Sequence, residues 1–360
     1  MQLQPLLQTM IAKQASDLHL KPGRPPILRV DGQLGWQPDT PPLTVEEVQS
    51  LYRELSSTAE RETFTQNREL DFAYSTASGA RLRVNVALQR GALTLSLRLL
   101  HATIPTLAEL HLPPVLGQLA LLHQGLVLVT GPTGSGKSTT LAAMLEEINR
   151  HAARHIVTVE DPIEYIFKEK QCLFTQREVG RDTHSFAAAL KYALRQDPDV
   201  IMVGEMRDLE TITAVLTAAE TGHLVLATLH TPSAPESIDR IVDVFPAHQQ
   251  AQVRAQLAMT LAGVVTQRLV PRAAGTGRVA ACEIMTGAPA IRNLIREGKT
   301  PQMRNVIQAG NEQGMQTLTQ ALQALYRAQL ITAATITHYN DPARNLSSNP
   351  ANYGQSSYQG

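Results

Sequence analysis

The feature that most constrains this chain is the stretch Leu126–Leu141, which reads LVLVTGPTGSGKSTTL. A short apolar run leads into a glycine-rich turn, a lysine and two hydroxyl residues, and a segment of helical character follows. Strand, loop and helix in this order form the context in which G-x-x-x-x-G-K-[ST] binds phosphate. Glycines let the backbone adopt positive φ and turn its N–H groups inward, and the helix dipole points at the same place. The sequence therefore predicts a site for a nucleoside triphosphate.

Nine consecutive residues are predicted to hold this nucleotide. They are Gly131, Pro132, Thr133, Gly134, Ser135, Gly136, Lys137, Ser138 and Thr139. In such a loop the lysine neutralises the β- and γ-phosphates and the serine hydroxyl binds Mg²⁺. The alternative, a glycine-rich turn with an incidental lysine, is poor because the flanking strand and helix both fit.

Composition narrows the class of protein. The chain has 360 residues, enough for two domains, and its 32 lysines and arginines balance 32 acidic residues. No overall charge favours nucleic acid or lipid, so we expect no nucleic-acid partner. Two distant cysteines, Cys172 and Cys282, fit a reducing compartment and argue against a structural zinc site. Without a signal-peptide pattern or a membrane-length apolar run, we expect a cytoplasmic protein with no direct membrane insertion.

Residues 1–102 are predicted to form a small domain of mixed type. The expected elements are helices at Leu3–Ala15 and Val45–Leu55, the latter capped by Thr44 with Glu47, and strands at Asp17–Leu20, Ile27–Val30, Asp71–Tyr74, Arg81–Leu88 and Ala92–Leu99. Four arginines lie in or beside the last strands: Arg81, Arg83, Arg90 and Arg98. From alternation alone, a solvated sheet face is the favoured interpretation of these arginines.

A proline-containing linker is expected at residues 103–114 and an α/β domain at 115–342. The predicted strands, Gly125–Thr130, His155–Val159, Val200–Val203 and His223–Leu229, alternate with helices, which is typical of a parallel sheet covered on both faces. The C-terminal third is predicted to be mostly helical. The tail, 343–360, is rich in Ser, Asn, Gly, Gln and Tyr and is predicted to be disordered.

A candidate catalytic carboxylate follows the apolar strand Val200–Val203 in DPDVIMVGEMRD. In an open parallel sheet, a carboxylate at the carboxyl end of a strand faces the same crevice as the phosphate loop. Glu205 is therefore predicted to orient the attacking water or to take its proton. The alternative is a purely structural role, in which Glu205 only forms an ion pair with Arg207.

Two further clusters end predicted strands. VEDPIE carries Glu160, Asp161 and Glu164, and three carboxylates so close together favour Mg²⁺ or its waters as a partner, although a solvated loop is the alternative. We expect Glu160 and Asp161, with Ser138, on the metal side and Glu164 among the catalytic residues. In GHLVLATLHT, His230 closes a strand that His223 opens. A γ-phosphate-sensing role for His230 is weighed equally against a packing or capping role.

These clusters, in this order, resemble the PilT/secretion-ATPase superfamily of P-loop NTPases. The four matching boxes are Walker A at Gly131–Ser138, the aspartate box at Val159–Glu164, an atypical Walker B at Ile201–Asp208 and the histidine box at Gly222–Thr231. Within the superfamily, the chain is most similar to the type IV pilus retraction ATPases. That similarity runs through SDLHL, RVDG, RLRVN, AIRNLIRE and GMQTL and covers the chain except its tail.

The resemblance implies an α/β fold with a RecA-like ATPase domain, a smaller α+β PAS-like N-terminal domain, and a homohexameric ring. It implies ATP and Mg²⁺ as cofactors, and ATP hydrolysis that powers pilus retraction and twitching motility. It also implies an inner-membrane platform protein and related pilus ATPases as partners, at the inner face of the cytoplasmic membrane.

The resemblance also changes the interpretation of two arginines. Arg81 and Arg98 match family positions that reach the nucleotide's phosphates, whereas His123-Gln124 stands where family members often carry a further arginine. In AIRNLIRE, the apolar residues predict a packed helix whose Arg292, Arg296 and Glu297 face outward, and the family associates the motif with retraction.

Three alternatives stay open. One is an accessory retraction paralogue, another an extension or secretion ATPase, although those usually carry a longer N-terminal region and a tetracysteine zinc site. A third, of a different class, is a nucleotide-gated interaction module with little hydrolysis.

Overall fold

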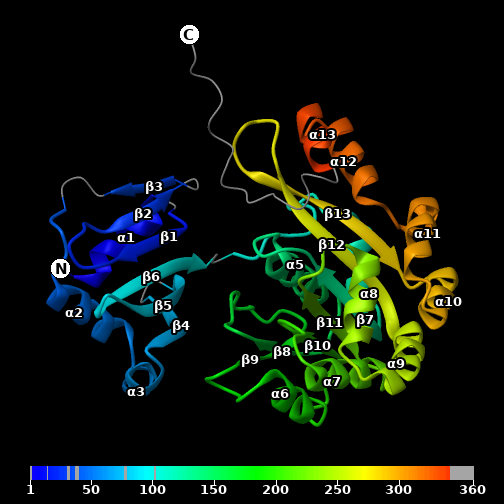
Figure 1. The fold of residues 1–360 in the computed structure, drawn as a ribbon, viewed down its shortest axis with the longest axis horizontal. Coiled ribbons are helices and arrows are strands. Elements are labelled where there is room, and N and C mark those ends of the chain that lie inside the picture. The colour runs from blue at the N-terminus through cyan, green and yellow to red at the C-terminus, as the bar shows by residue number, and fades with distance from the viewer. Residues whose placement is uncertain are drawn as a thin grey trace. The chain divides into compact units, whose positions relative to one another are not determined.

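The computed structural model describes residues 2–13, 15–30, 33–36, 40–76, 79–100 and 103–340 (Figure 1). The chain divides into two compact units. The first comprises Met1–Ile104, Glu160–Lys168 and Gln176–Asp182, and the second comprises Pro105–Val159, Glu169–Thr175 and Thr183–Gly360. The predicted disordered tail lies outside the described residues.

The first unit contains a six-stranded antiparallel sheet in the order β3-β2-β1-β6-β5-β4. Its strands are β1 (Asp17–Leu20), β2 (Ile27–Val30), β3 (Gln33–Trp36), β4 (Glu69–Ser75), β5 (Arg81–Gln89) and β6 (Ala92–Leu100). The helices are α1 (Leu3–Ala12), α2 (Val45–Leu55) and α3 (Thr58–Asn67). Leucines of α1 and α2 share one core with alternate residues of β5 and β6, so the predicted amphipathic patterns are confirmed.

Capping explains where the second helix begins. Thr44 accepts a hydrogen bond from the Glu47 N–H while the Glu47 side chain accepts one from the Thr44 N–H, which confirms the predicted capping box. Helix α3, which has the same capping box at Ser57 and Glu60, was not predicted from the sequence. No residue of α3 is buried, so it lacks the hydrophobic periodicity that reveals a helix in sequence.

The second unit is built on a seven-stranded sheet in the order β13-β12-β7-β11-β10-β8-β9. The strands are β7 (Gly125–Thr130), β8 (His155–Glu160), β9 (Leu173–Glu178), β10 (Val200–Val203), β11 (Leu224–Leu229), β12 (Leu261–Pro271) and β13 (Arg278–Thr286). Strands β12, β7, β11, β10 and β8 run parallel, and β13 is antiparallel to β12. The predicted α/β class with a parallel sheet is confirmed.

One helix precedes the first strand of this sheet and others connect the strands that follow. They are α4 (Val115–Ala120), α5 (Lys137–His151), α6 (Phe186–Ala193), α7 (Leu209–Glu220), α8 (Ala234–Asp243) and α9 (Ala247–Thr260). Apolar residues of α7, α8 and α9 join the inner strands in one large core. Every residue of β7 and β11 is buried, as expected for strands covered on both faces.

The prediction of a mostly helical C-terminal third is confirmed, except for the β12–β13 hairpin. The two strands of this hairpin pair from Gly263↔Thr286 to Pro271↔Arg278. A continuous apolar run such as LAGVV fits a buried strand or a buried helix equally well, so periodicity could not decide. The elements that follow are helical: α10 (Pro289–Glu297), η1 (Thr300–Gln302), α11 (Met303–Ala309), η2 (Asn311–Gln313), α12 (Leu318–Arg327) and α13 (Ala333–Asn340).

One arginine of AIRNLIRE does not face outward as predicted. Nε of Arg292 donates a hydrogen bond to the Gly287 carbonyl at 2.7 Å and Nη1 donates to the Met259 carbonyl at 3.0 Å. Backbone carbonyls at the ends of α9 and β13 need donors, and this guanidinium supplies them. Arg296 and Glu297 are exposed, as predicted. Among the described residues, no helix has the length and apolar character needed to cross a membrane.

Candidate active site

The phosphate loop connects the buried strand β7 to the first residue of α5. Gly131 has φ 138°, and a Cβ there would lie 2.4 Å from the carbonyl oxygen of Gln267. Gly136 has φ 90°, and its Cβ would lie 2.7 Å from Nε2 of the same glutamine. Both positions therefore require glycine for conformation and for space.

The Gln267 side chain supports this loop, a contact that was not predicted from the sequence. Its Nε2 donates to the Ser135 carbonyl at 2.6 Å, and its Oε1 accepts from Oγ1 of Thr140 at 2.8 Å. Gln267 is 2 % exposed, so the amide joins β12 to both the loop and α5 in a dry interior. The sequence does hold one signal for this role, the single amide side chain in the apolar run LAGVVTQRLV. Buried polar groups are almost always hydrogen-bonded, so a glutamine in a buried strand is expected to have a structural partner.

The loop's own residues fit a phosphate-bearing ligand. Nζ of Lys137 donates to the carbonyls of Gly131 at 2.9 Å and Pro132 at 3.1 Å, which holds the ammonium against the loop. The Ser135 hydroxyl is buried and has no hydrogen-bond partner among the described residues. Ser138 is exposed at the first turn of α5, and the amino end of a helix favours anions.

Glu205 lies just beyond the carboxyl end of β10, and His230 follows the carboxyl end of the neighbouring β11. Nε2 of His230 is 3.2 Å from Oε1 of Glu205, and Nη2 of Arg207 is 2.6 Å from Oε2. The structure thus brings the two predicted catalytic residues, Glu205 and His230, together. The ion pair between Glu205 and Arg207, which was the alternative to a catalytic role, is present as well. Because β11 also pairs with β7, this group lies at the same edge of the sheet as the phosphate loop.

The pKa of Glu205 is lowered from its usual value. Burial raises this pKa, but the hydrogen bond from Arg207 and the charges of His230 and Arg207 outweigh it. The carboxylate is therefore ionised at neutral pH and able to accept a proton.

Buried contacts fix the segment that carries His230. Oγ1 of Thr231 lies 2.6 Å from Oγ of Ser237, and the Ala234 N–H donates to the Glu283 carboxyl at 2.7 Å. Burial raises the pKa of Glu283, the largest influence on that group. The histidine is thus presented by a rigid turn rather than by a free loop.

The remaining predicted residues belong to the first unit. Oε1 of Glu160 accepts from Nε2 of Gln176 at 3.2 Å, Asp161 is exposed and Glu164 is partly buried. Among the described residues, no group of three or more histidines, cysteines and carboxylates could hold a metal ion. Mg²⁺ binding by Ser138, Glu160 and Asp161, partly through water, therefore stays a prediction.

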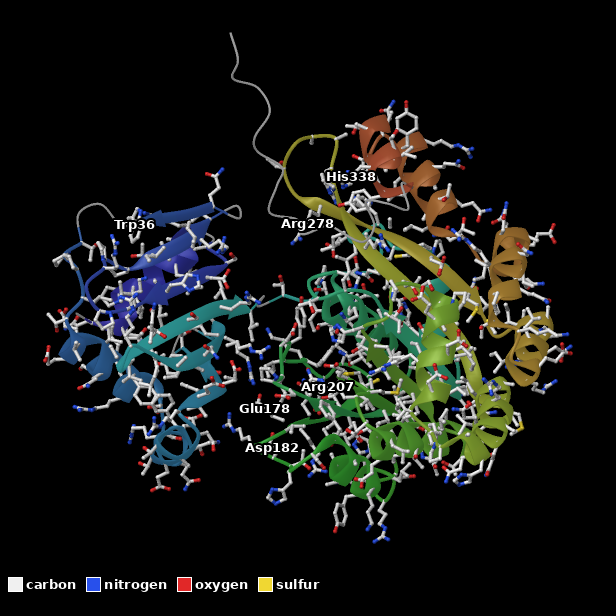
Figure 2. The ribbon with its side chains drawn as sticks, in the orientation of Figure 1. Trp36, Glu178, Asp182, Arg207, Arg278 and His338 are labelled. Atoms are coloured by element: carbon white, nitrogen blue, oxygen red, sulfur yellow. The ribbon has the colours of Figure 1, made fainter. Side chains whose placement is uncertain are left out.

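The two predicted arginines each have an acidic partner. Nη2 of Arg81 lies 3.0 Å from Oε2 of Glu178, which also accepts from the Ile163 N–H (Figure 2 labels Glu178). Nε of Arg98 lies 2.8 Å from Oδ1 of Asp17, and the Arg98 side chain is 66 % exposed. The roles of Arg81 and Arg98 toward nucleotide stay predictions.

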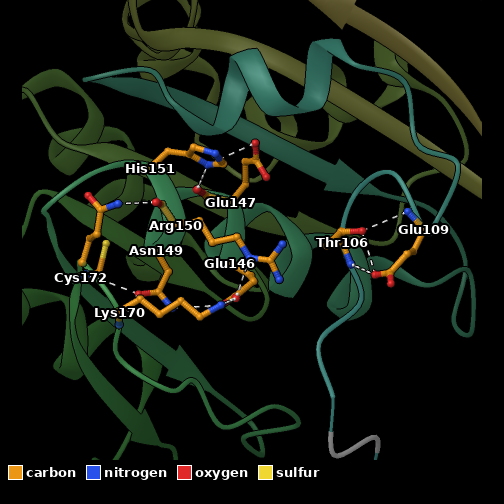
Figure 3. A network of polar contacts seen from close by, with 10 residues as sticks. Thr106, Glu109, Glu146, Glu147, Asn149, Arg150, His151, Lys170 and Cys172 are labelled. Atoms are coloured by element: carbon orange, nitrogen blue, oxygen red, sulfur yellow. Dashed lines mark hydrogen bonds and ion pairs between the residues drawn. The ribbon is translucent and has the colours of Figure 1, made fainter.

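The far end of α5 is anchored by a polar network (Figure 3). The Glu146 carboxylate accepts hydrogen bonds from Lys170, Asn149 and Arg150, while Oδ1 of Asn149 accepts from the Lys170 N–H. Burial acts to raise the pKa of Glu146, but these hydrogen bonds lower it overall. The helix that begins at Lys137 is therefore fixed at both ends.

Comparison with known proteins decides the family. Residues 1–349 match the model of the family described as "Type II/IV secretion system protein". The chain belongs to this family of secretion system proteins. Within the family, it is 50% identical over 322 residues to the "Type IV pilus retractation ATPase PilT" of Pseudomonas aeruginosa, covering 89% of this chain and 93% of that protein.

Two further comparisons extend over almost the whole chain. The "Type IV pilus ATPase PilU" of Pseudomonas aeruginosa is 42% identical over 346 residues, which cover 96% of this chain and 90% of that protein. A solved structure titled "Crystal Structure of the Pilus Retraction Motor PilT and Bound ADP" is 47% identical, with a TM-score of 0.88 and coverage of 95% of this chain and 98% of the other. The resemblance inferred from the sequence is confirmed.

Proposed function

We propose that this chain is an ATPase whose hydrolysis of ATP drives retraction of type IV pili. The observation that carries the proposal is the Glu205 side chain, held between His230 and Arg207 at the edge of the sheet that bears the phosphate loop. The likeness to a pilus retraction motor described with bound ADP supports the same function.

Each residue has a stated role in this proposal. Residues 131–139 bind the triphosphate, with Lys137 neutralising charge, and Ser138, Glu160 and Asp161 hold Mg²⁺ directly or through water. Bound Mg²⁺–ATP supplies the reactive phosphoryl group and neutralises its developing charge. Glu205 orients the attacking water and accepts its proton, and His230 senses the γ-phosphate. Glu164, Arg81 and Arg98 complete the catalytic set, the arginines by contacting phosphate oxygens.

The assembly is part of the proposal. We expect a homohexameric ring at the inner face of the cytoplasmic membrane, acting on an inner-membrane platform protein of the pilus, alongside related pilus ATPases. Specific ATPase activity should then rise with protein concentration as rings form, which an assay across a dilution series measures. Activity that is constant from the lowest to the highest concentration would contradict a ring enzyme.

The direct test of the site is Glu205→Gln. The amide keeps the size of the side chain but cannot accept the proton, so phosphate release should fall by about a hundredfold or more while ATP binding persists. Glu210→Gln, an exposed change in the first turn of α7, is the matched control and should keep normal turnover. Undiminished phosphate release from Glu205→Gln would refute the catalytic role.

An accessory retraction ATPase is the second candidate, because the chain is also 42% identical to a relative named as a type IV pilus ATPase rather than as a retraction ATPase. Deletion of the gene followed by imaging separates the possibilities. Abundant surface pili on cells that cannot twitch indicate the principal retraction motor. Bald cells indicate an extension ATPase, and nearly normal twitching indicates an accessory protein.

A further inference from the structure

One face of the first unit exposes an aromatic and an aliphatic side chain beside several cations. We call it the basic–aromatic face and define it as Lys21, Arg24, Leu34, Trp36 and Arg90. All four residues of β3 are exposed, Leu34 by 55 % and Trp36 by 54 % (Figure 2 labels Trp36). Large apolar side chains at such exposure, on one face of one strand, mark an interaction surface.

The cations of this face surround a small cavity. Lys21, Arg24 and Arg90 line a hollow of about 210 Å³ between the β1–β2 and β5–β6 turns. The Arg24 guanidinium also lies over the Trp36 ring, with 5.2 Å between its central carbon and the ring centroid, which joins the hollow to the aromatic side chain. No carboxylate of the described residues forms an ion pair with Lys21, Arg24 or Arg90. The face therefore carries positive charge that the described part of the chain leaves unneutralised.

The strand beside the cavity is an edge. β3 ends the sheet order and pairs only with β2 within the described residues, so its outer N–H and C=O groups face away from the sheet. An exposed edge strand is a template for a further strand from another chain.

We propose that the basic–aromatic face binds an acidic, extended segment of a partner protein. The segment pairs with the outer edge of β3 and packs an apolar side chain on Trp36. It then continues past the Trp36 end of the strand and places a carboxylate among Lys21, Arg24 and Arg90. The cavity is below the range of about 300–1,000 Å³ typical of small-molecule sites. A lipid surface fits less well because free backbone groups are costly there, and nucleic acid less well because one aromatic side chain makes no stacking platform.

Trp36 is the only tryptophan of the chain, so its fluorescence reports on this face alone. The full chain is titrated with a synthetic ten-residue peptide of alternating Glu and Val, and with a control peptide of alternating Lys and Val. We expect a saturable change in emission with the acidic peptide only, weakening as salt rises.

Charge reversal tests the contact itself. The double variant Lys21→Glu and Arg24→Glu should weaken binding of the acidic peptide by about tenfold or more, because like charges then oppose each other. Arg53→Glu, on the exposed side of α2, is the matched control and should bind normally. ATP hydrolysis should be unchanged in both, since neither alters the nucleotide site.

Three outcomes would overturn the proposal. They are the absence of a saturable emission change, an equal response to the lysine peptide, and undiminished binding by the double variant. Vesicles of phosphatidylserine and phosphatidylcholine provide the remaining comparison. An emission shift with vesicles but not with the acidic peptide would assign the face to a membrane surface instead.

Discussion

Nε2 of His230 lies 3.2 Å from Oε1 of Glu205, so two neighbouring parallel strands present a possible proton acceptor and its histidine partner in contact. The strands bring them together because β10 and β11 are parallel neighbours, with Val203 opposite Ala227, so both lead out of the sheet at the same edge. The contact allows His230 to orient the Glu205 carboxylate.

Replacing His230 by alanine should lower kcat for ATP hydrolysis by about tenfold to a hundredfold with little change in ATP affinity. The Glu205 carboxylate would lose its contact with His230 and keep its ion pair with Arg207. His223→Ala is the matched control, since His223 precedes the same strand and contacts the Ala218 carbonyl at its opposite end. Steady-state kinetics on both variants would refute the role if their losses were equal.

Replacing Arg207 by alanine should move the acidic limb of the pH–rate profile to higher pH. In the native chain, Arg207 and His230 hold the pKa of Glu205 below its usual value despite burial. The ionised form, and the stability it contributes, is therefore present above the usual pKa and is lost only as pH falls through the lowered one. Without Arg207, burial is less strongly opposed, so the pKa of Glu205 rises and its carboxylate is protonated at higher pH. Arg240→Ala, an exposed change at the end of α8, should leave the profile in place.

Replacing Gln267 by leucine should weaken ADP binding by about tenfold and lower the free energy of unfolding by about 1–3 kcal/mol, because the Ser135 carbonyl and Thr140 hydroxyl lose their partner. Titration with a fluorescent ADP analogue and thermal denaturation measure the two effects. Gln316→Leu removes a comparable bond, to the Cys282 carbonyl at 2.8 Å, without touching the phosphate loop. If both variants lost the same affinity, Gln267 would have no specific part in shaping the loop.

Replacing Arg81 by alanine should destabilise the chain by about 3 kcal/mol, because it leaves the Glu178 carboxylate buried without its cation. The matched control is Arg83→Ala. Arg83 lies on the same strand and both members of its ion pair with Asp71 are exposed, so its loss should lower the free energy of unfolding by about 0.5 kcal/mol. Denaturant unfolding of both variants compares the two costs directly. Equal costs would show that the Arg81–Glu178 pair is no stronger than a surface contact.

Local signals predicted much of the fold. The strand that enters the phosphate loop, the capping box at Thr44 and Glu47, and the carboxylate after β10 are each encoded within a few residues of sequence. Glu205 and His230 could be placed at one edge because parallel strands share their carboxyl ends. That inference needs only strand direction, not strand order.

Other features depend on partners far apart in the chain. Gln267 lies 132 residues from Ser135, and no local pattern connects them. The β12–β13 hairpin escaped prediction because a buried apolar run has no period, and β3 because four exposed residues have no buried face. Such contacts follow from sheet order, which the sequence of a single chain does not reveal.

Strand β12 carries more than the glutamine beneath the phosphate loop. Three residues beyond Gln267, Val270 enters a separate core with Leu322 and Leu325 of α12 and with Ile331. A mechanical load on the C-terminal helices would therefore strain the same strand that shapes the nucleotide pocket. A truncated chain that keeps every nucleotide-binding motif but ends before α12 would expose this strand to water and bind ATP more weakly.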